Sequence, residues 1–338
     1  MVNYKFEYAW SSGDLPGEPK FHYPVPQSIS KPIVTGLKSL IPNIDFLELF
    51  SLQQAHALSG RFIAKSKSST WLLRVTERLG YSELEKKILD YALSQGISLS
   101  PILYSEIIKV DGKYYRVDVR PFIHGDHFDG STKKIYLLAK ELSKLHKGLA
   151  DFPDRNRIQI ISRQRYQALE ETRKLLGEAI TNNCLEIFGS TEAWVRKNMN
   201  WLQLLVTMFD PRMDLRPSAQ CLHGEVHPGN VLFQEGYPIL IDFEESVHTF
   251  APPDWDLAFL VQRFCMNRKT GELDRNLFKA VTDGYGTSLP PLSMTMRQAA
   301  WFSVAVALQS IRNGLIVPNS ELDKFVLFEE FARSIEQE

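Results

Sequence analysis

The chain has 338 residues, of which 44% are hydrophobic, so it is long enough for two lobes of ordinary domain size with sizeable cores. Its 39 lysine and arginine residues nearly balance its 40 aspartate and glutamate residues, and the formal net charge is -1. This balance argues against a generic binder of nucleic acids or membrane surfaces. The most apolar run, 299–308, is too short to span a bilayer.

Cysteine usage and the first residues predict a cytoplasmic protein. Cys184, Cys221 and Cys265 are far apart and form no Cys-x-x-Cys pair, which is typical of unpaired thiols in a reducing compartment. Residues 1–7 lack the apolar core of a signal peptide. Residues 1–30 are rich in proline, glycine and aromatic residues and are predicted to form an N-terminal extension. Nothing in the sequence indicates an oligomeric state.

Short apolar runs predict a small antiparallel sheet in the first third of the chain. Strands are predicted at 46–50, 61–64 and 70–75. A hairpin is predicted at 107–119, because its Asp111–Gly112 pair is a strong signal for a tight turn.

One helix is predicted between these strands, at 82–94, where apolar residues fall on one face and Gly96 follows the C-terminal end. Its first residues also match a capping box, in which the Glu85 side chain would bond back to the Ser82 amide. The rest of the chain is predicted to be mainly helical. Helices are predicted at 133–149, 159–180, 192–209, 294–313 and 320–335.

Polar residues with metal-binding chemistry follow two short predicted strands in the second half of the chain. The sequence reads Cys-Leu-His-Gly-Glu-Val-His-Pro-Gly-Asn-Val-Leu-Phe at 221–233 and Ile-Leu-Ile-Asp-Phe-Glu-Glu at 239–245. Asn230 closes the loop after the first strand, and Asp242 follows the second. A hairpin-like arrangement would bring an amide oxygen and a carboxylate to one ion, and Mg²⁺ prefers such oxygen ligands.

These two segments resemble the catalytic and metal-binding loops of the aminoglycoside phosphotransferase and choline kinase-like superfamily. Its members phosphorylate small molecules, and the usual catalytic loop reads His-Gly-Asp-x-x-x-x-Asn. In this chain Glu225 replaces that Asp. The resemblance implies an α+β, two-lobed, protein-kinase-like fold. It would comprise the extension at 1–30, a small antiparallel-sheet N-lobe at 31–124 and a mostly helical C-lobe at 125–338, which carries the catalytic and metal loops.

The resemblance also implies roles in catalysis and metal binding. Glu225 would orient and deprotonate the acceptor hydroxyl, and His223 would brace the catalytic loop. Asn230 and Asp242 would bind Mg²⁺. The family often has Asp-Leu-Ala after the metal strand, and Asp256 is expected to cap a helix there and to brace the catalytic loop. Asp254 is an alternative cap.

For the nucleotide, the resemblance implies a phosphate-covering loop at 56–61, which includes Gly60. Arg74 would bind the α- and β-phosphates, where a planar guanidinium fork suits phosphate oxygens. Glu85 would steady Arg74, which competes with its capping role. The backbone of Phe122 and Ile123 would bind adenine at the hinge, because Pro121 has no amide donor.

The leading hypothesis is an ATP- and Mg²⁺-dependent phosphotransferase that acts on a hydroxyl of a small molecule, either aminoglycoside-like, an amino-alcohol, homoserine or a sugar. The short segment between Asp242 and Asp254 does not fit the activation loop of a protein kinase. The acidic residues Glu244, Glu245 and Asp254 would attract an amine-bearing acceptor, or they are solvated loop charges.

Two alternatives remain. In the first, the chain is a nucleotide-binding protein with little or no turnover, because Glu225 replaces the usual Asp. Alternatively, His223, Glu225 and His227 alternate along a strand, face one side and bind zinc or iron.

Overall fold

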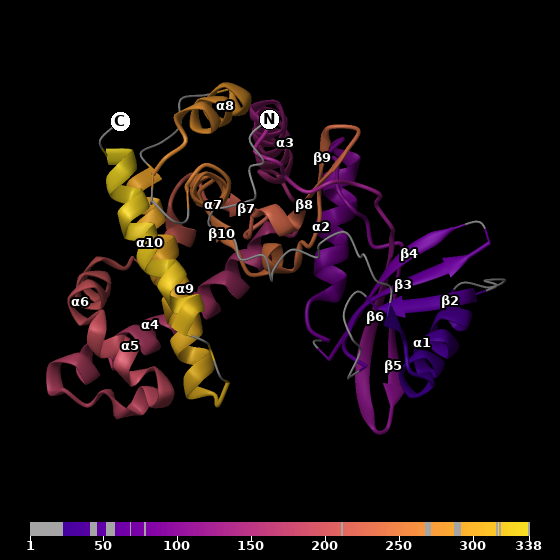
Figure 1. Ribbon diagram of the computed structural model, residues 1–338, viewed down its shortest axis with the longest axis horizontal. Coiled ribbons are helices and arrows are strands. Elements are labelled where there is room, and N and C mark those ends of the chain that lie inside the picture. Colours follow the sequence, from indigo (N-terminus) through magenta and orange to yellow (C-terminus); the bar gives the residue numbers. More distant parts are fainter. Residues whose placement is uncertain are drawn as a thin grey trace. The chain divides into compact units, whose positions relative to one another are not determined.

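The chain forms two compact units, which we call the sheet unit and the helical unit (Figure 1). The sheet unit contains residues of Ser11–His127 and of Val231–Asp242, and the helical unit contains residues of Phe128–Asn230 and of Phe243–Glu338. The computed structural model describes residues 23–40, 46–51, 58–67, 69–77, 79–210, 212–267, 272–286, 292–315, 317 and 319–336.

The sheet unit is built on an antiparallel sheet of 6 strands in the order β1-β2-β3-β4-β6-β5. The expected strands and hairpin are present, and the structure extends most of them by a few residues. The strands are β1 (Tyr23–Pro24), β2 (Phe46–Ser51), β3 (Gly60–Ser66), β4 (Thr70–Thr76), β5 (Tyr104–Val110) and β6 (Lys113–Pro121).

The two faces of this sheet have opposite chemistry. One face is apolar and packs against α1 (Gln27–Leu40), with Phe62, Leu73 and Val117 in the shared core. Because side chains alternate along a strand, the intervening residues of β4 and β6 lie on the other face, toward α2 (Ser82–Ser94). That face carries arginines and carboxylates, which are described below. The predicted bounds of α2 are confirmed.

Helix α1 was not predicted, and its first four residues lie in the segment assigned to the N-terminal extension. Pro32 and Gly36 lie inside α1, and both residue types disfavour a helix interior. Gly36 has a packing role, because a Cβ atom there would lie 2.5 Å from Ile108 Cγ2. Glycine therefore lets α1 approach the sheet closely. Residues 1–22 of the predicted extension lie outside the described residues.

The hairpin of β8 (Val231–Gln234) and β9 (Tyr237–Leu240) belongs to the sheet unit, although it was predicted to lie in the C-lobe. Long-range backbone hydrogen bonds hold it there. The Leu240 amide donates to Ser98 O at 3.0 Å, and the Phe233 amide donates to Asp126 O at 2.8 Å. These partners are more than 100 residues away along the chain, so no local pattern in the sequence reveals them.

The helical unit has a core centred on α9, where Trp301, Val304 and Leu308 are fully or almost fully buried. The helix predicted at 192–209 is divided by Asn198 into α5 and α6. Helix α7 lies where a helix beginning near Asp254 or Asp256 was expected, and α8 was not predicted. The described helices of the helical unit are α3 (Thr132–Leu149), α4 (Arg155–Asn182), α5 (Glu192–Lys197), α6 (Met199–Met208), α7 (Asp254–Phe264), α8 (Arg275–Tyr285), α9 (Leu292–Arg312) and α10 (Asn319–Glu336).

The sequence does contain start and stop signals for α8. The Asp274 side chain accepts hydrogen bonds from the amides of Asn276 and Leu277, and Gly286 ends the helix with a φ of 79°. An N-terminal aspartate cap and a left-handed glycine are typical of helix ends. None of the helices within the described ranges has the length and apolar character needed to span a membrane.

Helices α3 and α8 approach so closely that Gly284 has no room for a side chain. A Cβ atom there would lie 2.2 Å from Tyr136 O and 3.1 Å from Ala139 Cβ. Gly284→Ala should therefore lower the free energy of unfolding by about 1–3 kcal/mol, the usual cost of overpacking. Gly80→Ala is the control, because nothing lies within 4 Å of its added Cβ. Chemical denaturation of both variants checks this, and equal stability would contradict the close approach of α3 and α8.

Candidate functional site

The predicted catalytic loop follows a two-stranded ladder in the helical unit. Strand β7 (Gln220–Cys221) pairs antiparallel with β10 (Phe250–Ala251), and Cys221 lies opposite Phe250. Cys221 is fully buried, and burial raises the pKa of its thiol far above the ordinary value. This thiol is therefore neutral, and it anchors the loop by packing.

Gly224 allows the loop to make its first turn. Its φ is 90°, a conformation that side-chain-bearing residues rarely adopt. A Cβ atom there would lie 2.6 Å from Thr249 Oγ1 and 3.0 Å from Glu245 O. Both the backbone conformation and the close approach explain the glycine of the His-Gly-Glu motif.

Asp256 braces the loop from the first turn of α7, as predicted. Its carboxylate is 0% exposed; Oδ2 accepts from the His223 amide at 3.0 Å, and Oδ1 accepts from the Gly224 amide at 2.9 Å. The prediction of a side-chain helix cap is wrong for both aspartates, because Pro253 occupies the N-cap position without a side-chain bond. Asp254 Oδ2 instead accepts from Thr295 Oγ1 at 2.7 Å.

A hydrogen-bonded chain extends this brace to α3 and α8. His146 Nδ1 lies 2.8 Å from the Tyr285 hydroxyl, and His146 Nε2 lies 3.1 Å from Asp256 Oδ2. Burial, followed by the charges of Asp256 and Asp254, raises the pKa of Tyr285, so its hydroxyl remains protonated. A protonated Tyr285 donates to Nδ1, and the Nε2 proton of His146 then points to Asp256. Tyr285 was not identified from the sequence.

Three polar residues of the loop, His223, Glu225 and Asn230, are held in different ways. His223 is 0% exposed; its Nδ1 accepts from the Glu225 amide at 3.3 Å, and its ring lies 4.5 Å from the Phe243 ring. Asn230 Nδ2 donates to Glu225 O at 3.0 Å. The backbone of Glu225 is thus held on both sides, whereas its side chain is 46% exposed.

Each of the two predicted Mg²⁺ ligands offers an oxygen atom of suitable chemistry within its own unit. Because the Asn230 amide nitrogen donates to Glu225 O, its Oδ1 points elsewhere and accepts no hydrogen bond from the described residues. An amide oxygen in this state is a suitable hard ligand. Asp242, in the sheet unit, has a φ of 61°, and both of its carboxylate oxygens face guanidinium groups. A cation is therefore the natural partner of this carboxylate.

The alternative metal site of two histidines and one glutamate is not formed. No group of three or more histidine, cysteine, aspartate or glutamate side chains among the described residues could hold a metal ion. Residues 223–227 form a loop and not a strand. His227 Nε2 lies 3.7 Å from Glu225 Oε1, whereas the His223 ring lies against the Phe243 ring. The Nδ1 atoms of His223 and His227 instead accept from the amides of Glu225 and Gly229.

In the sheet unit, Glu85 binds partners that were not predicted from the sequence. Glu85 is 2% exposed; its Oε1 lies 2.6 Å from Arg120 Nη2, and its Oε2 lies 3.1 Å from Arg116 Nη2. The prediction of a capping box is wrong, because Tyr81 is the N-cap of α2 and no side chain caps this end. The alternation Arg116-Val-Asp118-Val-Arg120 in a buried strand was the signal that could have revealed this cluster.

Arg74 pairs with Asp242 instead of the expected Glu85. Arg74 Nη1 lies 3.4 Å from Asp242 Oδ1, and Arg61 Nη2 lies 2.6 Å from Asp242 Oδ2. The pKa of Arg74 lies below its ordinary value, chiefly because of burial, while the charges of Asp242 and Glu85 act in the opposite direction. Glu85 thus acts on Arg74 only through space.

The expected hinge and phosphate loop are only partly described. The Phe122 amide donates to Thr70 O at 3.2 Å, so the sheet already uses this donor. The Ile123 amide donates to no backbone carbonyl of the described residues. Gly60 is the first residue of β3 and pairs with Val75. Residues 56 and 57 of the expected phosphate loop lie outside the described residues.

The acidic residues expected near the acceptor are partnered. Glu245 forms an ion pair with Arg165, and the guanidinium of Arg165 also lies 4.7 Å from the Phe302 ring centroid. Asp254 is bonded to Thr295, as described above. Neither is a solvated loop charge, and Glu245 is already neutralised within the helical unit.

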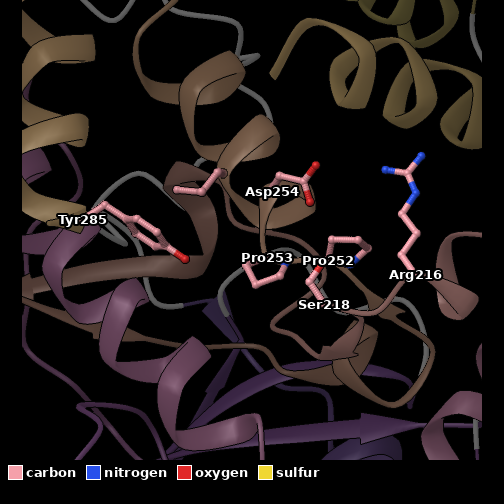
Figure 2. Close-up of a pocket in the computed structure, with 7 residues that line it drawn as sticks. Arg216, Ser218, Pro252, Pro253, Asp254 and Tyr285 are labelled. Carbon is pink, nitrogen blue, oxygen red and sulfur yellow. The ribbon is translucent and has the colours of Figure 1, made fainter. Parts of the chain in front are cut away.

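A cavity of about 240 Å³ lies behind the catalytic loop (Figure 2). Ser218 precedes β7 and Pro252 follows β10, so the cavity lies at the end of this ladder opposite the loop. Figure 2 shows Tyr285 and Arg216 on its two sides, with Asp254 between them. The cavity borders the Tyr285–His146–Asp256 chain, and it lies away from Glu225.

Comparisons with known proteins show a family and a shared fold. The sequence model of the phosphotransferase enzyme family matches residues 56–290. A spectinomycin phosphotransferase, solved with ADP and spectinomycin, is 18% identical, with a TM-score of 0.60 over 91% of this chain and 98% of that chain. A choline kinase from Streptococcus pneumoniae is 13% identical, with a TM-score of 0.52 over 90% of this chain and 99% of that chain.

A putative fructosamine-3-kinase from Haemophilus somnus is 12% identical, with a TM-score of 0.51 over 91% of this chain and 98% of that chain. At these identities, the structures show a shared fold, and the expected α+β fold with a strand-rich and a helical part is confirmed. No curated protein sequence matches this chain.

Proposed function

Because this chain belongs to the phosphotransferase enzyme family, we propose that it transfers the γ-phosphoryl group of ATP to a hydroxyl of a small molecule, with Mg²⁺. The observation that carries this proposal is the catalytic loop. It presents a half-exposed Glu225 carboxylate on a backbone that Asp256, His223 and Asn230 hold by hydrogen bonds. Phosphoryl transfer requires such a positioned carboxylate to orient the attacking hydroxyl.

In the proposed reaction, Glu225 accepts a hydrogen bond from the acceptor hydroxyl and takes its proton as the oxygen attacks the γ-phosphorus. The bond between the γ-phosphorus and the β–γ bridging oxygen breaks, and ADP leaves with that oxygen. His223 is a positioning residue, because its buried ring acts on the Glu225 amide. Asn230 Oδ1 and the Asp242 carboxylate would hold Mg²⁺. The β8–β9 hairpin begins directly after Asn230 and ends two residues before Asp242. When bound, Mg²⁺ would offset the negative charge of the phosphates.

Nucleotide binding is assigned to the sheet unit. Arg74 would bind the phosphates, and Gly60 lies at the end of the segment expected to cover them. Glu85 would act indirectly, by fixing Arg116 and Arg120 between α2 and the sheet. Adenine would contact the hinge at the Ile123 amide and the Phe122 carbonyl, since the Phe122 amide is already bonded. The similar spectinomycin phosphotransferase was solved with ADP, which supports an adenine nucleotide.

The proposed acceptor is a polar small molecule with a free hydroxyl, such as an aminoglycoside-like compound, an amino-alcohol, homoserine or a sugar. Spectinomycin, choline and fructosamine appear in the names of the similar structures, and these compounds belong to different classes. An ATP-consumption screen across these classes, with Mg²⁺ present, identifies the acceptor. Acceptor-dependent phosphate transfer supports the proposal, and its absence across all classes would favour a nucleotide-binding protein without turnover.

Nucleotide should stabilise the folded protein. Mg²⁺ with ATP should raise the melting temperature more than ATP alone, because a ligand that binds only the folded state stabilises it by about 2.7 kcal/mol at 100 times its Kd. Differential scanning fluorimetry measures the shift. Asp242→Asn should remove the additional shift from Mg²⁺, because an amide brings no charge to the ion. The phosphotransferase proposal fails if millimolar ATP causes no shift with or without Mg²⁺.

A further inference from the structure

We infer that Arg61 is a second phosphate-binding residue, which Asp242 holds in place before nucleotide binds; the inference rests on the proposed function. Arg61 and Arg74 are direct partners across β3 and β4, so their side chains leave the same face of the sheet. Both reach the same carboxylate, at 2.6 Å from Arg61 Nη2 and 3.4 Å from Arg74 Nη1. Any ligand that binds at Asp242 therefore meets two guanidinium groups.

Arg61, Arg74 and Asp242 together carry one net positive formal charge. The deeper arginines, Arg116 and Arg120, are neutralised by the buried carboxylates of Glu85 and Asp118, at distances of 2.6–3.1 Å. Both outer arginines reach the carboxylate of Asp242. An anion is therefore attracted to this end of the cluster, and a chain of phosphates has the charge and the oxygen atoms to satisfy both guanidinium groups.

Exposure distinguishes the two arginines. The Arg61 side chain is 54% exposed, whereas the side chains of Arg74 and Asp242 are 14% and 16% exposed. Arg61 can therefore move between partners at little cost in packing, while Arg74 is fixed. An exposed ion pair contributes little stability of its own, so Asp242 releases Arg61 readily when a stronger cation arrives.

These contacts imply an exchange of partners on binding. Mg²⁺ at Asp242 competes with Arg61 and Arg74 for the same oxygens, so Mg²⁺ alone binds weakly. When nucleotide is present, both arginines bind phosphate oxygens, and the competition ends. Mg²⁺ and nucleotide should therefore strengthen each other's binding, and thermodynamic linkage requires the same factor in both directions.

A purely structural role for Arg61 predicts the opposite change in Mg²⁺ affinity when Arg61 is replaced. If Arg61 only supports the left-handed Asp242 backbone, its loss should disorder that carboxylate and weaken Mg²⁺ binding. If Arg61 is a phosphate ligand that occupies Asp242, Arg61→Gln should strengthen the binding of Mg²⁺ alone and weaken the binding of nucleotide. The sign of the change in Mg²⁺ affinity separates the two roles.

Isothermal titration calorimetry of the full chain with MgCl₂, with ADP, and with ADP in saturating MgCl₂ tests the inference. Arg61→Gln should weaken ADP binding about 10-fold or more, the usual scale for a hydrogen bond between charged partners. The ADP affinity of Arg61→Lys should lie between that of Arg61→Gln and that of the wild type, because lysine keeps the charge and loses the planar fork.

Lys65→Gln is the matched control. It removes one positive charge from the same strand, four residues along, where the ammonium lies 5.5 Å from the Phe50 ring. Its ADP affinity should match the wild type. If the wild type binds ADP but Arg61→Gln binds it equally tightly, or binds Mg²⁺ more weakly, the Arg61 inference is overturned and the proposed function stands. If the wild type binds no ADP, both are overturned.

Discussion

Replacing Glu225 by glutamine should lower turnover on the true acceptor by about 10²- to 10⁴-fold, the usual contribution of a general base. The amide is isosteric but cannot take the proton of the hydroxyl. Nucleotide affinity should change little, because this carboxylate is assigned to the acceptor and not to the phosphates. Steady-state kinetics with ATP, Mg²⁺ and the acceptor found in the screen measure the effect. Equal turnover in the wild type and in Glu225→Gln would contradict a base role.

Glu225→Asp separates an active enzyme from a disabled one. If the acceptor pocket is adjusted to glutamate, the shorter side chain withdraws the carboxylate by one methylene, and turnover should fall. A misplacement of about 1 Å can cost on the order of 100-fold in rate. If glutamate is instead a disabling replacement of the family's aspartate, Glu225→Asp should raise turnover above the wild type. Cooperative unfolding of both variants is the control, and the half-exposed side chain makes large losses of stability unexpected.

Local patterns carried most of the correct predictions from the sequence. The helix at 82–94 was placed without error because its apolar spacing and its terminal Gly96 are properties of the segment itself. Local patterns also indicated strands β2 to β6, most of which the structure extends by a few residues, and the loop at 221–230, whereas β1 was not predicted. A family resemblance added the brace from Asp256, which the hydrogen bonds to His223 and Gly224 confirm.

The errors concern partners that are distant in sequence. Glu85 was assigned to Arg74 or to its own helix end, but strand register brings Arg116 and Arg120 to face α2. Helix α1 was missed because a proline and a glycine lie inside it, and their tolerance depends on packing against the sheet. Arg61 was interpreted as the last residue of the expected phosphate-covering loop and the first residue of a strand, and its side chain was given no role. Its role depends on Asp242, which is 181 positions away.

Removing the Asp256 carboxylate should have the largest effect on the integrity of the catalytic loop. Asp256→Ala leaves the amides of His223 and Gly224 and the Nε2 proton of His146 without their acceptor, in a region that is closed to solvent. Breaking a buried charged network in this way typically costs about 3–5 kcal/mol of the free energy of unfolding. The loop that carries Glu225 should then lose its fixed position, and kcat should fall by about 100-fold or more.

Because Asp256 acts through the loop, its effect should differ from that of a catalytic residue. Chemical denaturation and kinetics on Asp256→Ala should show stability and kcat falling together, while ADP affinity, which we assign to the sheet unit, should remain near the wild type. Tyr285→Phe tests the far end of the same chain: it removes the donor to His146 Nδ1 and should cause a smaller loss of both quantities. Asp254→Asn is the control from the same helical turn, since its carboxylate bonds Thr295 and not the loop. If Asp256→Ala kept wild-type kcat at temperatures where it is folded, the hydrogen bonds of Asp256 would not be what positions Glu225, and the brace would have to lie in His223 and Asn230 alone.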